Sequence, residues 1–264
     1  MPDTPKVATL IATHNYGHYL VDAINSALNQ TYPNEVWVVD DASTDDTEQL
    51  MYCHESNPFT AVHRSDEIEA CSYAIVDGKK IFYLKLKVNG GPSRARNIGI
   101  VNAMQGGAQF IQVLDADDIM KPTKIEELIK PFLADPQSVG ATYADYTIWT
   151  LPDDTKQYEA KSSYSWNRLM AECIVHSGSL INCLALQKVA LGVEGKPYPI
   201  FYLEELRTCE DYNLWMRIAK SMIFVHVPKN LTIVRNQPNN STLTVDRQTW
   251  ARNYQYAKQQ ALSS

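Results

Sequence analysis

Strand-like and helix-like patterns alternate along the first half of this chain. Apolar runs at 7–12, 36–39, 81–88 and 110–114 have the length and composition of buried strands. Helical signals separate them: an apolar stripe at 20–28, a Ser/Thr/Asp cap at 43–47, a helix from Pro92 to the glycines at 106–107, and an apolar face at 122–133. Repeated strand–helix units predict an α/β fold with a mainly parallel sheet flanked by helices.

The remaining segments are harder to interpret. The stretch 51–80 breaks the alternation, and we expect an insertion or an edge hairpin there. After residue 139 the pattern predicts strands at 141–149, 179–186, 223–227 and 231–234, and helices at 166–175, 212–220 and 246–262.

The apolar run at 110–114 ends in three carboxylates: Asp115, Asp117 and Asp118. Such close charges raise one another's pKa values unless a divalent metal, a charged ligand or solvent relieves them. The run at 36–39 also ends in acids, Asp40 and Asp41. Because parallel strands bind ligands at their carboxyl ends, we expect both groups to face one crevice. For each group, a solvated turn or a helix cap is the alternative.

Composition excludes some classes of function. A formal charge of -6 argues against a general nucleic-acid binder, which usually carries a basic face. The first thirty residues lack a basic segment followed by an apolar one, and no stretch approaches the roughly 18 uninterrupted apolar residues of a membrane span. We therefore expect a cytoplasmic protein with no transmembrane segment, for which peripheral membrane association stays open.

Five motifs in order resemble those of the family-2 inverting glycosyltransferases, whose fold is the nucleotide-sugar-binding domain called GT-A. They lie at 9–15, 38–45, 89–97, 114–118 and 210–215. The similarity covers nearly the whole chain except 51–80 and the C-terminal tail. It implies one GT-A domain over 1–264, with a nucleotide-sugar-binding half at about 1–118, an acceptor-binding half at about 119–235, and a tail or helix at 236–264.

The resemblance assigns a nucleotide site to two strand ends. It implies that Thr13, His14 and Asn15 line the base, and that Asp41 accepts a hydrogen bond from it. A carboxylate suits a uracil imide N–H chemically. Relatives carry Tyr where His14 stands, which leaves the base less certain, and a loop histidine without a ligand is the alternative for His14.

The resemblance also assigns a metal site. Asp115 and Asp117 match the family's DxD motif, in which the first acid approaches the ribose and the second holds Mn²⁺ or Mg²⁺ bridging the diphosphate. Such a metal stabilises the charge of the departing nucleoside diphosphate. Asp118 is expected to support the site or to face the acceptor. Arg96 is expected to add positive charge near the phosphates, with a surface ion pair as the alternative.

Inversion at the anomeric carbon needs a base that takes the proton of the acceptor hydroxyl. Asp211 matches the second acid of the family's Glu-Asp motif and is our candidate for this base, with Glu210 as a supporting neighbour. The alternative is that both acids merely stabilise a helix N-terminus.

One motif departs from the family. Relatives often carry Arg-x-His shortly after the last strands, where the histidine helps to hold the metal or the pyrophosphate, whereas this chain has Arg235, Asn236 and Gln237. Glutamine is a poor substitute. Either metal binding relies on Asp117, the diphosphate and water, or His176 or His226 enters from elsewhere. The Gln-x-x-Arg-Trp motif of processive polysaccharide synthases is absent, which favours addition of a single sugar.

The sequence therefore predicts a metal-dependent inverting glycosyltransferase of polysaccharide biosynthesis. It would move a sugar from a nucleotide-diphosphate sugar, with UDP favoured, to a hydroxyl of a glycan or lipid-linked glycan. A sugar nucleotidyltransferase is one alternative, but it would bring a Gly-rich basic loop after the first strand, and 13–16 has none. A non-catalytic module that binds nucleotide sugar or carbohydrate is the other, and retention of Asp117 and Asp211 argues against it.

Overall fold

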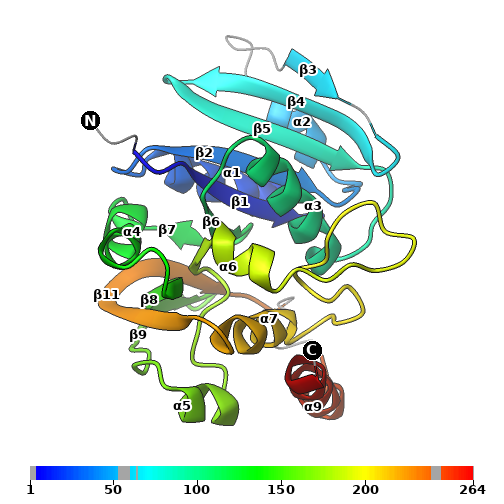
Figure 1. Ribbon diagram of the computed structural model, residues 1–264. Coiled ribbons are helices and arrows are strands. Elements are labelled where there is room, and N and C mark those ends of the chain that lie inside the picture. Colours follow the sequence, from blue (N-terminus) through cyan, green and yellow to red (C-terminus); the bar gives the residue numbers. More distant parts are fainter. Residues whose placement is uncertain (1–3, 53–59, 64, 239–244, 264) are drawn as a thin grey trace.

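One mixed β-sheet runs through the part of the chain that the computed structural model describes, which is residues 4–52, 60–63, 65–238 and 245–263 (Figure 1). Its strands are β1 (Val7–Thr13), β2 (Asn34–Asp40), β3 (Thr60–His63), β4 (Ile68–Val76), β5 (Lys79–Leu86), β6 (Phe110–Asp115), β7 (Ile119–Met120), β8 (Val139–Thr150), β9 (Thr155–Glu159), β10 (Leu180–Asn182) and β11 (Ile223–Asn236). The helices are α1 (Gly17–Leu28), α2 (Thr47–Tyr52), α3 (Pro92–Gln105), α4 (Lys124–Ala134), α5 (Trp166–Ala171), α6 (Cys183–Lys188), α7 (Glu210–Ala219) and α9 (Arg247–Ser263).

The strand order is β3-β4-β5-β2-β1-β6-β10-β8-β11-β7, with β9 paired to β8. Pairing is parallel in the centre, from β5 through β2 and β1 to β6, where α1 and α3 supply the crossovers that parallel strands require. Outside this centre β4 runs antiparallel to β5, and β10 runs antiparallel to both β6 and β8. The predicted parallel arrangement thus describes the centre of the sheet, and its flanks make the sheet mixed.

The register of the central strands brings the predicted acidic ends together. Thr13 at the end of β1 lies opposite Asp40 of β2, and Ala12 lies opposite Asp115 of β6. The prediction that the two acidic groups meet at one edge is confirmed. Parallel register is the physical reason, because it aligns equivalent strand ends.

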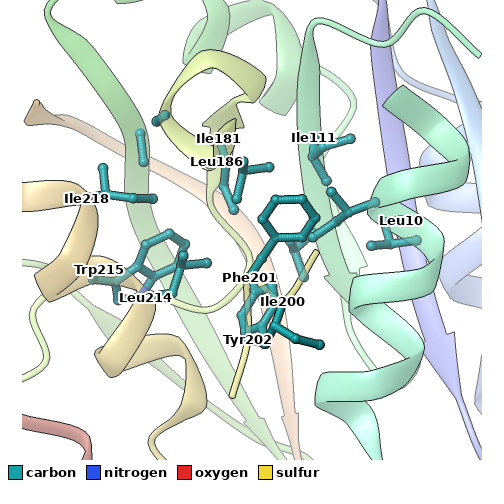
Figure 2. Close-up of a cluster of buried hydrophobic side chains, with 14 of the residues drawn as sticks. Leu10, Ile111, Ile181, Leu186, Ile200, Phe201, Tyr202, Leu214, Trp215 and Ile218 are labelled. Atoms are coloured by element: carbon teal, nitrogen blue, oxygen red, sulfur yellow. The ribbon is translucent and has the colours of Figure 1, made fainter. Parts of the chain in front are cut away.

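Residues on alternate positions of β1 pack into separate cores on the two faces of the sheet. Ala8 and Leu10 join the core with α3, α6 and α7, while Val7 and Ile11 join the core with α1 and α4. Figure 2 shows the first core, where Ile200, Phe201 and Tyr202 lie between Leu10 and Ile111 on one side and Leu214, Trp215 and Ile218 of α7 on the other. This packing fixes the chain just before α7 begins.

Several elements differ from the sequence prediction. The strand expected at 179–186 stops at Asn182, whose side chain accepts a hydrogen bond from the N–H of Leu184 at 2.9 Å and thereby starts α6. The two strands expected at 223–227 and 231–234 are one strand, β11, with irregular register near 227–232. The helix expected at 166–175 ends at Ala171. Within 51–80, β3 and β4 pair antiparallel at the edge of the sheet, in line with the expected edge hairpin, and residues 53–59 and 64 lie outside the described part.

No helix in the described part of the chain is both long enough and apolar enough to cross a bilayer.

Candidate active site

A pocket of about 610 Å³ opens at the carboxyl edge of the central strands. This volume is within the range of small-molecule sites. Its walls come from the ends of β1, β2 and β6, the start of α3, the loop before α7, the end of β11 and the first turn of α9. Of the predicted residues, Thr13, His14, Asp41, Arg96, Asp115, Asp117, Asp118, Glu210 and Asp211 line it.

At the β1–β2 end of the pocket, Asp41 is buried and holds the loop before α3. Its carboxylate accepts hydrogen bonds from the backbone N–H groups of Gly90 at 2.9 Å and Gly91 at 2.6 Å. Gly91 has φ 88°, a left-handed conformation that favours glycine because a side chain there would be strained. An ionised carboxylate has about four acceptor positions, so Asp41 can still accept from one further donor.

The three residues after β1 play different parts. The buried Thr13 hydroxyl has no hydrogen-bond partner in the structure and lines the pocket. The Nδ1 of His14 lies 2.9 Å from the carbonyl oxygen of Asp41. Asn15 turns away: its side-chain oxygen accepts from the N–H of Thr44 at 2.8 Å, and it does not line the pocket. The Asn15 side chain thus points to the loop that follows β2 and away from the position expected beside the base.

Arg96, on the second turn of α3, joins two of the motifs. Its guanidinium donates to Asp115 at 2.8 Å and to Glu210 at 2.7 Å, and its side chain is 9% exposed. Burial alone would lower the pKa of Arg96, but Asp115 and Glu210 outweigh it and raise the pKa. Arg96 is therefore a buried cation paired with two carboxylates and not a surface ion pair. Because it lines the pocket, its expected contribution of positive charge near the phosphates stays a prediction.

Asp115 is held in its ionised form. Burial would raise the pKa of this carboxyl, yet Arg96 and further hydrogen bonds lower it below the usual value. One of these comes from the Ser177 hydroxyl, 3.0 Å from its second oxygen.

The next two acids have no such compensation. Burial and the charge of Asp115 raise the pKa of Asp117 to about 6. The pKa of Asp118 is also raised, first by burial and then by Asp115 and Asp117, although it accepts from the N–H of Arg235 at 3.1 Å. The Lys124 ammonium is buried and has no hydrogen-bond partner among the described residues, and burial lowers its pKa to about 8. The turn that holds Asp115, Asp117 and Asp118, here called the acidic turn, thus carries negative charge, and a bound cation would relieve the repulsion between these carboxylates.

The residue in place of the expected histidine contacts the acidic turn directly. The side-chain amide of the buried Gln237 donates to Oδ2 of Asp117 at 3.0 Å. Gln237 therefore orients the expected metal ligand, a role that we did not expect from the sequence.

Neither histidine suggested as a replacement is placed to bind a metal. His226 lies against Asp145, with Nε2 2.7 Å from the carboxylate, and does not line the pocket. His176 lines the pocket, but burial lowers its pKa to about 3, and its Nδ1 accepts the N–H of Gly178 at 3.0 Å. A neutral imidazole that accepts at Nδ1 carries its proton on Nε2, so His176 faces its surroundings as a donor.

Asp211 lies in the first turn of α7, and Cys209, the residue before the helix, sets the direction in which the helix begins. Cys209 adopts a left-handed conformation, φ 63°, which a non-glycine residue holds only where its surroundings impose it. Asp211 accepts the N–H of Tyr212 at 2.7 Å. Burial, then Glu210 and Asp115, raise its pKa to about 7. A carboxylate with this pKa can take up and release a proton near neutral pH.

Other wall residues were missed at the sequence level. Arg207 and Thr208 come from the loop before α7, and Trp250 comes from α9. Arg207 is exposed and makes a long contact, 3.4 Å, with the carbonyl oxygen of Gly90. Within 246–262, a tryptophan in an otherwise polar helix was the only sequence signal for Trp250.

The donor set suits a hard divalent cation, with one limit. Asp117 offers carboxylate oxygen, which Mg²⁺ and Mn²⁺ prefer. Among the described residues, no three His, Cys, Asp or Glu side chains gather into a metal centre. A metal at Asp117 would therefore need further ligands from a bound substrate, as Mg²⁺ commonly does with phosphates.

The chain belongs to glycosyltransferase family 2. The model of the family described as Glycosyl transferase family 2 matches residues 9–178, more than half of the chain. An uncharacterised glycosyltransferase of Rickettsia bellii is 25% identical over 244 residues, which cover 90% of this chain and 30% of that protein. The chain thus spans about a third of the length of this curated relative.

Two solved structures share the fold. TarS of S. aureus (residues 1–349, in complex with UDP-GlcNAc) aligns with a TM-score of 0.62 at 18% identity, over 91% of this chain and 61% of that one. The mannosyltransferase PcManGT of Pyrobaculum calidifontis, in complex with GDP-Man and Mn²⁺, aligns with a TM-score of 0.62 at 17% identity, over 100% of this chain and 66% of that one. The predicted GT-A fold is confirmed.

Proposed function

We propose that this glycosyltransferase is metal-dependent and inverting, and that it transfers a sugar from a UDP-linked donor to a carbohydrate hydroxyl. One observation carries the proposal: Arg96 hydrogen-bonds both Asp115 and Glu210, so the acidic turn and the Glu210–Asp211 pair meet in one pocket. The bound donors of the two structural neighbours support a nucleotide sugar as the substrate. The cytoplasmic location and the peripheral membrane association expected from the sequence stay predictions.

Donor recognition begins at the β1–β2 end. The free acceptor capacity of Asp41 suits the imide N–H of uracil, and the unpartnered Thr13 hydroxyl lies in the same wall. Asp115, kept ionised by Arg96, is available to a ribose hydroxyl, and Asp117 with the diphosphate would hold Mn²⁺ or Mg²⁺. When bound, the metal stabilises the charge of the leaving nucleoside diphosphate.

Acceptor activation falls to Asp211. With a pKa of about 7, its carboxylate can take the proton of an attacking hydroxyl. Attack from the face opposite the departing diphosphate inverts the anomeric carbon. Glu210 accepts a hydrogen bond from Arg96, which also binds Asp115, and this shared contact keeps the first turn of α7 close to Asp115.

A thermal-shift panel of UDP- and GDP-sugars with and without Mn²⁺ tests the donor and the metal. At 100 times its dissociation constant, the correct donor with Mn²⁺ is expected to stabilise the fold by about 2.7 kcal/mol. Asp117→Ala should abolish the part of the shift that depends on Mn²⁺. Asp153→Ala, at an exposed position outside the pocket, should leave it unchanged. Equal shifts in wild type and Asp117→Ala would remove Asp117 from the metal site.

A further inference from the structure

The C-terminal helix α9 forms a wall of the pocket on the side of Asp211. It lies next to α7 in Figure 1, and Trp250 in its first turn lines the pocket together with Thr208, Cys209 and Asp211. The family match ends at residue 178, so this wall belongs to the part of the chain outside it.

Contacts along α9 hold this wall in place. The Asn253 amide donates to the Thr208 hydroxyl at 2.8 Å, three residues before Asp211. Farther along, the Asn213 amide of α7 donates to the carbonyl oxygen of Ala257 at 2.9 Å. The Lys258 ammonium donates to the carbonyl oxygen of Met170 at 2.8 Å. The helix is therefore held against α7, which carries Asp211, and against the loop that precedes α7.

Trp250 itself is rigidly placed at the start of α9. The Asp246 carboxylate accepts the N–H groups of Gln248 at 3.0 Å and Thr249 at 2.9 Å, and the carbonyl oxygen of Asp246 accepts the N–H of Trp250 at 3.0 Å. The indole is partly buried against the core. A ring held in this way presents apolar surface to the pocket without losing much conformational entropy when a ligand binds.

The chemistry of this corner suits a sugar ring. A pyranose carries axial and equatorial C–H groups on one face, and the negative face of an aromatic ring attracts such polarised hydrogens while burying apolar area. Asp41 and Asp117, which we assign to the donor, lie directly after β2 and in the β6–β7 turn, on other segments than α7 and α9. The Trp250 indole therefore lies on the same side of the pocket as Asp211, the proposed catalytic base, and not on the side of the nucleotide site.

We propose that Trp250 forms the acceptor subsite, where its indole supports the sugar ring whose hydroxyl is deprotonated by Asp211. This inference rests on the proposed function, since it assigns an acceptor to the same pocket. It identifies the acceptor class as a carbohydrate that offers a pyranose face, and it gives α9 a role in acceptor choice. The competing role for Trp250 is packing of α9 alone.

Indole N–H signals in ¹H–¹⁵N NMR spectra test the assignment directly. The chain has 5 tryptophans, and the spectrum of Trp250→Phe identifies the Trp250 signal. Wild-type protein saturated with UDP and Mg²⁺ is titrated with the methyl glycosides of glucose, galactose, mannose and N-acetylglucosamine. At least one glycoside should shift the Trp250 signal, while the signal of Trp166 on α5, which does not line the pocket, stays in place.

Variant kinetics separate recognition from packing. With the glycoside that gives the largest shift as acceptor, Trp250→Leu should raise the acceptor KM about 10-fold or more, Trp250→Tyr should restore it to within about threefold, and the matched control Trp166→Leu should leave it unchanged. The dissociation constant of UDP should be the same in all four proteins.

The outcomes distinguish the two levels of inference. UDP binding without any glycoside-induced shift of the Trp250 signal, or an unchanged acceptor KM in Trp250→Leu, overturns the acceptor subsite and leaves the donor assignment standing. Failure of every nucleotide to bind wild-type protein overturns the proposed function, and the acceptor subsite with it.

Discussion

The two sides of the pocket are built in different ways. On the side that we assign to the donor, Thr13, Asp41 and Asp115 lie at or just after the ends of adjacent parallel strands, so sheet register alone brings them together. On the acceptor side, Asp211 stands on α7, and its surroundings come from a loop before the helix and from α9. The geometry of the sheet thus determines the positions of the donor-side residues. Contacts between segments distant in sequence determine the positions of the acceptor-side residues.

The sharpest way to separate the two sides is to remove the base. Asp211→Asn keeps the shape of the side chain but cannot accept a proton, so turnover should fall by roughly 10²- to 10⁴-fold. Donor affinity, measured by titration with UDP, should stay near the wild-type value. A variant that retains full transfer activity would reassign the base.

Arg96 tests whether the two sides are independent. Arg96→Gln leaves Asp115 and Glu210 without their shared cation, and loss of one partner from a buried ion pair costs roughly 3–5 kcal/mol. Because the Asp115 side chain is 31% exposed, we expect a loss near the lower end, about 3 kcal/mol, in the free energy of unfolding from urea titration.

A matched control for this variant is Arg168→Gln, at an exposed position on α5, which should change the free energy of unfolding by less than about 0.5 kcal/mol. Equal stability of the two variants would show that Arg96 does not couple the motifs.

The pH dependence of turnover near pH 7 reports on the acceptor side, since the pKa of Asp117 on the donor side is lower, about 6. Burial and neighbouring carboxylates raise the pKa of Asp211 to about 7, and the base must be ionised to act. The rate should therefore rise with pH up to about 7 and fall about tenfold for each unit below it.

The effect of Asp211 on folding stability has the opposite dependence on pH. A raised carboxyl pKa means that the native state binds protons more tightly than the unfolded state, so this group stabilises the fold at low pH and loses that contribution as pH rises through 7. Asp211→Asn should accordingly be at least as stable as wild type at pH 8, measured by thermal unfolding.

The smallest expected effect lies on the donor side. Gln237→Ala removes the hydrogen bond that orients Asp117, and loss of such a supporting contact weakens metal affinity by about 10-fold. The concentration of Mn²⁺ that gives half of the thermal shift with UDP should rise accordingly, while UDP binding without metal stays unchanged. Gln157→Ala, on the exposed strand β9, serves as the control and should match wild type.

The sequence predicted the donor side well because its signals are local. An apolar run followed by acids marks a strand end, and parallel strands share one edge, so Asp41 and Asp115 could be placed without coordinates. Asn15 was misplaced because its side chain competes for backbone N–H groups of the loop after β2, a contact that a linear motif does not show.

The acceptor side, and the Gln237 contact on the donor side, were less predictable because they depend on long-range contacts. Asn253 meets Thr208 across 45 positions of the chain, and Gln237 meets Asp117 across 120. The pairing of Arg96 with Glu210 was likewise not predicted, since Glu210 lies 114 positions away and only the folded chain brings it within reach. The apolar run at 179–186 looked like a strand because burial favours both strand and helix, and the cap at Asn182 decided between them.

The shared guanidinium of Arg96 also constrains how this chain can diverge. Its planar fork reaches Asp115 with one nitrogen and Glu210 with another, and the single ammonium of a lysine cannot reproduce that geometry. A change at any one of the three positions leaves a buried charge without its partner, so the sites are expected to be inherited as a set. Comparison of descendants of a common ancestor should therefore show these three residues retained together or replaced together, even where the sugar and the acceptor have changed.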